Sequence, residues 1–272
     1  MLFDGVLIAS DFDGTLANSC GQISPGVRNA VRWFMENGGR FTVCTGRTYQ
    51  GFHSYSAEYI NAPVLLANGG MAYDYASGKI VYFDGAGDET IPALRDISAM
   101  FPSVCIELYP FGKSWAIHLN ERSEKHFTNQ GIVFEHASDP ADAPRPWAKV
   151  MLGGSRQDVR AVQEYLAHTH PETHFLPTDG EFLEILRPGV DKGAALVKLA
   201  GYLGVAPENM YAVGDGYNDV EMLRAAAEAF VPVNGDEYAK ACADHIVGSN
   251  DEDAVAEVID ILSRKYSLLR SV

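Results

Sequence analysis

The 272-residue sequence lacks most of the features that mark membrane, secreted or repetitive proteins. No apolar stretch reaches the length needed to span a bilayer, and no basic segment precedes the short N-terminal apolar run, which argues against a signal peptide. No repeat or low-complexity tract is evident. Cysteines are few and scattered without a Cys-x-x-Cys spacing, so we expect reduced thiols in a cytoplasmic protein. They are Cys20, Cys44, Cys105 and Cys242.

Positive charge is also scarce, with 21 Lys and Arg against 36 Asp and Glu and a formal net charge of −15. A nucleic-acid surface needs Lys and Arg to meet phosphates, so this balance argues against nucleic-acid binding. The composition, 47% hydrophobic and 21% charged, is that of a globular protein. A chain of this length can form one large domain or two smaller ones. An anionic substrate would need local positive charge against this acidic background.

The N-terminal part alternates strand-like and helix-like segments. Residues 6–10, 40–44 and 64–67 read as strands. One helix begins at Ser24-Pro25, where Ser24 can cap it and Pro25 takes the first helical position, and another is expected after Thr48. This alternation predicts a parallel sheet with helices on its faces.

A different pattern occupies the middle of the chain. Short strand-like segments there are separated by two helical stretches, and Asp179-Gly180 is a strong hairpin signal. The expected strands are 106–108, 115–119, 149–152, 173–176 and 182–186, and the expected helices are 92–100 and 157–168. Alternating strands and helices return after residue 190. We therefore expect an α/β fold: a Rossmann-like parallel-sheet core from residues 1–83 and 188–272, with an α+β cap domain inserted over residues 84–187.

Two aspartates stand at the end of the first expected strand, in Asp11-Phe12-Asp13-Gly14-Thr15. Side chains two residues apart in an extended segment point to the same side, so Asp11 and Asp13 should face one small volume. Carboxylates that close repel one another unless a cation or a shared proton compensates them. The pair predicts a hard cation such as Mg2+, which prefers oxygen ligands, and Gly14 lets the chain turn sharply.

Three more polar motifs flank expected core elements. They are Thr45-Gly46-Arg47, Asp191-Lys192-Gly193 and Gly214-Asp215-Gly216-Tyr217-Asn218-Asp219. Ligands of open parallel sheets bind outside the carboxyl ends of the strands. Three of the four motifs follow strands directly, and the lysine motif can reach the same edge from a helix N-terminus. Clustered carboxylates, a hydroxyl and one lysine suit phosphoryl transfer, which depends on positioning and on neutralising negative charge.

In this order, the four motifs resemble those of the haloacid dehalogenase-like hydrolase superfamily. The long insert resembles the cap of its Cof-type sugar-phosphatase branch, as do Leu66-Ala67-Asn68-Gly69-Gly70 and Leu183-Glu184-Ile185. The resemblance covers essentially the whole chain. It implies a Mg2+-dependent phosphatase whose cap closes over the site and supplies specificity. True dehalogenases of the superfamily lack the second aspartate, so the presence of Asp13 implies phosphoryl chemistry.

The resemblance also implies catalytic roles. Asp11 would be the nucleophile that forms an aspartyl-phosphate, and a Mg2+ ligand. Asp13 would be the general acid and base, and would ligate Mg2+ through its backbone carbonyl. Thr45 would hydrogen-bond the phosphoryl group. Lys192 would neutralise that group and the Asp11 carboxylate.

The remaining implied roles concern the metal and the phosphate. Asp215 would ligate Mg2+, and Asp219 would support it from the same loop. Asn218 would orient Lys192 or the phosphate. The implied phosphate-binding set is Thr45, Gly46, Asn68, Lys192 and Asn218.

The expected partner is a small phosphorylated metabolite, with a sugar phosphate favoured, and neither nucleic acid nor a membrane; the oligomeric state stays open. Two alternatives also stay open. A hexose-phosphate mutase would pass the phosphoryl group to a second sugar hydroxyl instead of water. A non-catalytic metabolite-sensing module would bind the same ligand without turnover.

Several other residues have two interpretations each. Glu184 could contact substrate or simply face solvent on an alternating strand. His168, His170 and His174 could hold a transition metal, although Pro171 interrupts them. The aromatic cluster after Arg47 could line the site entrance, but the helical spacing of Phe52, Tyr55 and Tyr59 is more typical of packing on the sheet. That cluster comprises Tyr49, Phe52, His53 and Tyr55.

Overall fold

The computed structural model describes residues 1–53, 59–177 and 180–270. The chain divides into two compact units. Unit 1 comprises Met1–Gly46, Ser56–Val81 and Asp191–Val272, and unit 2 comprises Arg47–Tyr55 and Tyr82–Val190. Within the described residues, no helix is both long enough and apolar enough to cross a membrane.

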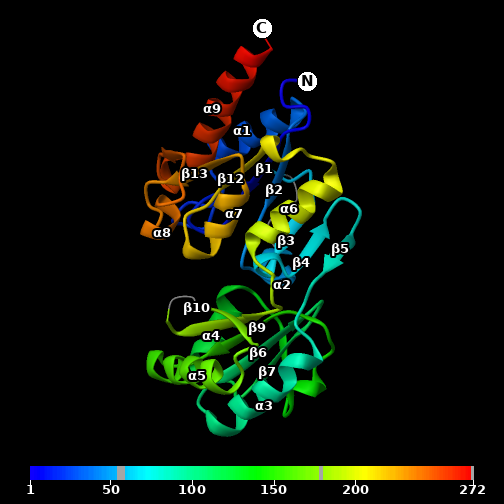
Figure 1. Cartoon of the computed structure of the whole chain (residues 1–272), viewed down its shortest axis with the longest axis vertical. Coiled ribbons are helices and arrows are strands. Elements are labelled where there is room, and N and C mark those ends of the chain that lie inside the picture. Colours follow the sequence, from blue (N-terminus) through cyan, green and yellow to red (C-terminus); the bar gives the residue numbers. More distant parts are fainter. Residues whose placement is uncertain (54–58, 178–179, 271–272) are drawn as a thin grey trace. The chain divides into compact units, whose positions relative to one another are not determined.

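Unit 1 is built on a five-stranded sheet in the order β14-β13-β12-β1-β2, with every neighbouring pair parallel (Figure 1). The strands are β1 (Leu7–Ser10), β2 (Arg40–Val43), β12 (Met210–Val213), β13 (Glu228–Pro232) and β14 (His245–Val247). β1 lies between a strand from its own end of the chain and one from the opposite end. The expected parallel core assembled from both chain ends is therefore present.

The helices of unit 1 begin where the sequence provides caps. In α1 (Pro25–Glu36), the Ser24 hydroxyl accepts a hydrogen bond from the Val27 amide, which satisfies one otherwise unpaired donor of the first turn. In α6 (Lys192–Leu203), the Asp191 carboxylate accepts from the Ala194 amide. The remaining helices are α7 (Val220–Ala225), α8 (Glu237–Lys240) and α9 (Ala254–Leu269), and α9 packs against α1.

Residues 64–67 do not extend the parallel sheet in the way the alternation predicts. β3 (Val64–Leu66) pairs antiparallel with β4 (Met71–Asp74), in a three-stranded sheet completed by β5 (Lys79–Phe83). A single parallel bridge, Cys44 to Leu65, connects β3 to the end of β2. The tight turn after β3, with Ala67 and Asn68 in the left-handed region at φ 52° and 53°, sends the chain back along β3. Hydrophobic periodicity carries no signal for that reversal.

Unit 2 contains a six-stranded sheet in the order β10-β11-β9-β6-β7-β8, antiparallel except for the β7–β8 pair. Its strands are β6 (Cys105–Pro110), β7 (Ser114–Ile117), β8 (Phe134–His136), β9 (Trp147–Gly153), β10 (His174–Pro177) and β11 (Phe182–Leu186). The antiparallel pairing of β10 and β11 confirms the expected hairpin strands, while Asp179 lies outside the described residues.

The helices of unit 2 cover both faces of this sheet. They are α2 (Tyr49–His53), α3 (Ile91–Met100), α4 (Glu121–Asn129) and α5 (Arg156–Thr169). Ile106 and Leu108 pack with α3 and α5 in one core, whereas Tyr109 packs with Phe127 of α4 in another. The sequence gives no hydrophobic periodicity for α4, because its nine residues are mostly polar and Phe127 is the one large apolar side chain that it buries.

The short helix α2 is held within unit 2 by Gln50. Its amide nitrogen donates to the Gly112 carbonyl, and its amide oxygen accepts from the Val133 amide at 2.8 Å. The Tyr49 ring packs on Phe111, with ring centroids 4.8 Å apart. These contacts explain why Arg47–Tyr55 belongs to unit 2, although it directly follows Gly46 of unit 1.

We predict that Ile106→Ala lowers the free energy of unfolding of unit 2 by about 2–5 kcal/mol, because it leaves a cavity in a fully buried core. Urea unfolding followed by the fluorescence of Trp115 and Trp147 measures the change. Val133→Ala is the matched control, because Val133 is 62% exposed and its truncation should stay within about 0.5 kcal/mol. Equal losses in the two variants would contradict the assigned core.

Candidate active site

Three buried or half-buried carboxylates meet at the carboxyl edge of the unit 1 sheet. Asp11 directly follows β1, and Asp215 and Asp219 lie on the loop after β12. One carboxylate oxygen of each lies within 4.8 Å of the others. Across the described residues, no other set of three His, Cys, Asp or Glu side chains comes close enough to share an ion. The two strands are neighbours, and this adjacency brings together residues two hundred positions apart.

Lys192 lies fully buried between two of these carboxylates. Its Nζ is 2.5 Å from Asp11 Oδ1 and 2.5 Å from Asp219 Oδ1. Burial alone lowers the pKa of an ammonium group, but the charges of Asp11 and Asp219 outweigh it and raise the Lys192 pKa. The lysine therefore stays protonated. It is the first residue of α6, so the Asp191 cap that starts the helix also fixes where this side chain begins.

Negative charge remains in excess around this lysine. Burial raises the pKa of Asp11 well above its usual value, and Asp219 and Asp215 raise it further, against the lowering effect of Lys192. Burial also raises the pKa of Asp215 to about 6, and the nearby Asp219 charge adds to that rise. Three carboxylates against one ammonium group leave room for a divalent cation. An all-oxygen donor set of this kind fits Mg2+.

Asp219 also shapes the loop that carries Asp215. While its Oδ1 meets Lys192, its Oδ2 accepts hydrogen bonds from the amides of Asp215 and Gly216 at 3.0 and 2.9 Å. Both oxygens are thus occupied by protein donors, so Asp219 connects the lysine to the loop. The capping-box geometry of the short turn Tyr217–Asp219 depends on the same side chain.

Two residues of the first motif complete the surroundings of Asp215. The Thr15 hydroxyl donates to Asp215 Oδ1 at 2.6 Å, a role that sequence analysis did not assign although Thr15 belongs to the motif. Gly14 has φ +82°, and a Cβ there would lie 2.5 Å from Asp215 Oδ2. Glycine is therefore required both by the turn and by the close approach of the carboxylate.

The polar residues predicted to bind phosphate gather at the end of β2. Thr45 is buried, and its carbonyl accepts from the Asn68 amide at 3.0 Å. The Asn218 side chain donates to Asn68 Oδ1 at 3.0 Å. A Cβ on Gly46 would lie 3.3 Å from the Asn68 amide group. Thr45, Gly46, Asn68 and Asn218 thus form one group within unit 1.

Asp13 is exposed and lies in the turn between β1 and Ala17. Its side chain is not part of the carboxylate set of Asp11, Asp215 and Asp219. This placement leaves Asp13 accessible from solvent.

The less specific sequence signals lie in unit 2. Glu184 is buried and forms an ion pair with Lys149 at 2.7 Å, so its interpretation as a solvent-facing residue is wrong. His168 contacts the Glu164 carbonyl and His170 contacts Asp96, so these two rings have separate partners. Phe52 is buried, and Tyr55 lies outside the described residues.

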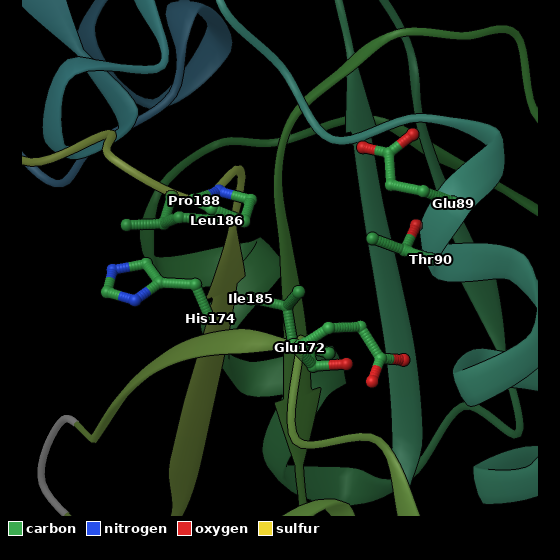
Figure 2. Close-up of a pocket in the computed structure, with 8 residues that line it drawn as sticks. Glu89, Thr90, Glu172, His174, Ile185, Leu186 and Pro188 are labelled. Atoms are coloured by element: carbon green, nitrogen blue, oxygen red, sulfur yellow. The ribbon is translucent and has the colours of Figure 1, made fainter.

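Unit 2 also contains a cavity of about 220 Å3 beside the end of β11 (Figure 2). Ile185, Leu186 and Pro188 line one side of it, and Glu89 and Thr90 approach from the start of α3. None of the residues predicted for catalysis, phosphate binding or Mg2+ binding lines this cavity, although His174 of the histidine group does. The carboxylate set of Asp11, Asp215 and Asp219, together with Lys192, lies instead in unit 1.

Comparison with known proteins connects this arrangement to phosphatases. A sequence model described as haloacid dehalogenase-like hydrolase matches residues 8–259. The chain is 26% identical to pyridoxal phosphate phosphatase YbhA of Escherichia coli (strain K12), over 93% of this chain and 97% of that protein. It is 27% identical to 5-amino-6-(5-phospho-D-ribitylamino)uracil phosphatase YwtE of Bacillus subtilis (strain 168), over 96% and 99% of the two chains.

Among solved structures, a haloacid dehalogenase-like hydrolase from Bacteroides thetaiotaomicron superposes with a TM-score of 0.85. The sequence identity is 28%, and the alignment covers 94% of this chain and 99% of that one. The likeness therefore extends over both units.

We predict that Lys192→Met lowers the free energy of unfolding by about 3–5 kcal/mol in metal-free buffer, because it leaves two buried carboxylates without their counter-charge. Loss of the lysine should raise the Asp11 pKa further. A carboxyl group whose pKa is higher in the folded state stabilises at low pH and loses that contribution as pH rises. The deficit relative to the parent protein should thus be larger at pH 8 than at pH 5.

Urea unfolding in the presence of a chelator, at both pH values, measures this deficit. Lys198→Met is the matched control, because Lys198 lies exposed on the same helix. A deficit that did not grow with pH, or that matched the control, would contradict the electrostatic account of Lys192.

Proposed function

The chain belongs to the haloacid dehalogenase-like hydrolase family, in its Cof-type branch, and we propose that it is a Mg2+-dependent phosphatase acting on a small phosphorylated metabolite. Family membership together with the phosphatases among its relatives supports a phosphoric monoester hydrolase. The single observation that carries the finer proposal is the buried Lys192 ammonium between Asp11 and Asp219, with Asp215 beside them. One nucleophilic carboxylate, one fixed cation and further metal-ligating oxygens are what phosphoryl transfer requires.

In this proposal, Asp11 is the nucleophile. A carboxylate oxygen of Asp11 attacks phosphorus, the bond from phosphorus to the leaving oxygen breaks, and an aspartyl-phosphate forms. Lys192 favours the charged, nucleophilic form of Asp11, because its contact lowers the Asp11 pKa against the larger rise that burial causes. Asp13 donates a proton to the leaving oxygen and later removes one from the water that hydrolyses the intermediate.

The metal would be held by the Asp11 and Asp215 carboxylates and the Asp13 backbone carbonyl, with Asp219 supporting Asp215. When bound, Mg2+ supplies positive charge against the phosphoryl oxygens. Thr15 contributes by fixing one Asp215 oxygen through its hydroxyl. The excess of carboxylates over ammonium groups supports a cation here.

The phosphoryl group would be bound by Lys192 and by the group at the end of β2. The Thr45 hydroxyl and the Gly46 amide are donors for phosphate oxygens, and the contact between Asn218 and Asn68 fixes the two amides at that edge. Lys192 supplies the local positive charge that an anionic substrate needs in so acidic a protein. The Thr45 and Gly46 donors add hydrogen bonds to that charge.

Unit 2 would act as the cap and supply specificity. A small phosphate ester is supported by the named activities of the relatives, on pyridoxal phosphate and on 5-amino-6-(5-phospho-D-ribitylamino)uracil. A sugar phosphate is the substrate class we favour, on the Cof-type resemblance. The four free cysteines support a reducing compartment such as the cytoplasm.

We predict that Asp11→Asn lowers turnover of a generic aryl phosphate at least ~1,000-fold, because the amide cannot serve as the nucleophile. Release of inorganic phosphate at saturating Mg2+ measures it. Asp4→Asn, at an exposed site of unit 1, is the control and should match the parent. Undiminished release by the Asp11 variant would exclude the assigned nucleophile. Isomer formation without phosphate release would instead indicate a mutase.

We also predict that chelation abolishes activity and that added Mg2+ restores it. Thr15→Val should raise the Mg2+ concentration for half-maximal activity by about 10–100-fold, since hydrogen bonds to a metal ligand tune its affinity. Thr42→Val is the matched control: the Thr42 hydroxyl is also buried, but it donates to the Pro63 carbonyl within the same unit.

Mg2+ titrations of activity and of the melting temperature give two independent readouts. Activity that survived thorough chelation would contradict the metal requirement. Equal Mg2+ dependence of the two threonine variants would contradict the role of Thr15.

A further inference from the structure

Two asparagines from the C-terminal part of unit 1 hold the turn that carries Asp13. The Asn234 side chain donates to the Gly14 carbonyl at 2.8 Å, and the Asn250 side chain donates to the Ala17 carbonyl at 2.9 Å. The Asn250 backbone amide in turn donates to Asn234 Oδ1 at 3.0 Å. The two amide groups and the turn are thus joined in one hydrogen-bonded chain.

These asparagines follow strands that do not pair with β1. Asn234 follows β13 and Asn250 follows β14, and in the sheet order β12 separates both strands from β1. The loop of Asn234 also contacts the loop after β12, because the Asp236 amide donates to the Asp215 carbonyl at 2.8 Å. One segment therefore holds the first motif through Gly14 and the fourth motif through Asp215.

The turn needs such support because of where Asp13 lies. Asp13 is exposed, whereas Asp11 is fixed by burial and by Lys192. Within the turn, the Leu16 amide donates to the Asp11 carbonyl at 3.3 Å and the Ala17 amide to the Phe12 carbonyl at 2.8 Å. The turn backbone thus contributes to the orientation of Asp13, and the asparagines add anchors to that backbone at Gly14 and Ala17.

We propose that Asn234 and Asn250 are positioning residues, which form a brace that orients Asp13 for proton transfer and for its backbone contact with the metal. The proposal rests on the proposed phosphatase function. Neither residue touches the reacting atoms; both act through the carbonyls of the turn. A displacement of about 1 Å at a reacting group can lower a rate by about 100-fold, so the loss of this brace should lower kcat measurably.

The test compares Asn234→Ala, Asn250→Ala and the double variant with Asn61→Ala. Asn61 is a matched control because its side chain also donates to a carbonyl, that of Gly39 at 2.9 Å, and accepts from an amide, that of Phe41 at 2.7 Å. It does so at the start of β2, the opposite end of the strand from Thr45. Each of the four variants loses at least one hydrogen bond from an asparagine side chain to a backbone carbonyl of unit 1.

Two measurements separate positioning from general stability. At saturating Mg2+, each brace variant should lower kcat about 10–100-fold with KM changed less than about threefold, because an interaction realised in the transition state is lost. In the metal-free and substrate-free protein, hydrogen exchange of the amides of residues 12–18 should become faster. Asn61→Ala should change neither quantity. The double variant should lose less than the product of the single losses, because the residues act as one unit.

Unchanged kcat or unchanged exchange in the brace variants would overturn the proposal, and so would an equal loss of kcat in Asn61→Ala. Failure of the proposed function has a different signature, since the parent protein itself would then release no phosphate. If the parent protein released no phosphate but the amides of residues 12–18 still exchanged faster in the variants, the asparagines would support the turn without a catalytic role. That result would also overturn the proposal.

Discussion

The buried ammonium group of Lys192 is the interaction on which the site depends. It contacts carboxylates from two distant segments, Asp11 after β1 and Asp219 after β12. Each of these charges would be costly to bury alone, because desolvation disfavours the ionised form. Together they make a group that is stable only when the two ends of the chain have come together. We therefore expect assembly of the site to be coupled to the folding of unit 1.

Further polar contacts connect this group to the loop of Asp215 and then to the outer turn that carries Asp13. Asp219 fixes the loop of Asp215 by accepting hydrogen bonds from two of its backbone amides. Thr15, in the turn after the neighbouring strand β1, donates a hydrogen bond to the Asp215 carboxylate. Asn234 and Asn250 then hold the outer turn. Burial thus declines from the fully buried Lys192 toward the exposed Asp13, the residue proposed to exchange protons with leaving group and water.

The sequence allowed the parallel core and its polar edge to be predicted, since three of the four motifs follow strands with clear apolar runs and the lysine motif begins a helix. It also placed the Ser24 cap of α1, because Ser24 satisfies a local donor, and the start of α6 at the Asp191-Lys192-Gly193 motif. What it missed depends on tertiary contacts. The antiparallel β3–β4 pair follows from a reversal at Asn68, and the pairing of Glu184 with Lys149 from strand register. Neither the roles of the asparagines nor that of Thr15 has a periodic signature.

The docking of α2 within unit 2 has a consequence for how this protein can evolve. The chain passes from Gly46 of unit 1 into Arg47 of unit 2 before returning, so the second motif is divided between the two units. A recombination event that exchanged only the continuous insert would separate Gln50 from its partners at Gly112 and Val133. Replacement of the insert alone is therefore constrained, because a new insert would need an α2 whose side chains fit it. We expect the sequences of α2 and of its contact sites in the insert to change together during evolution.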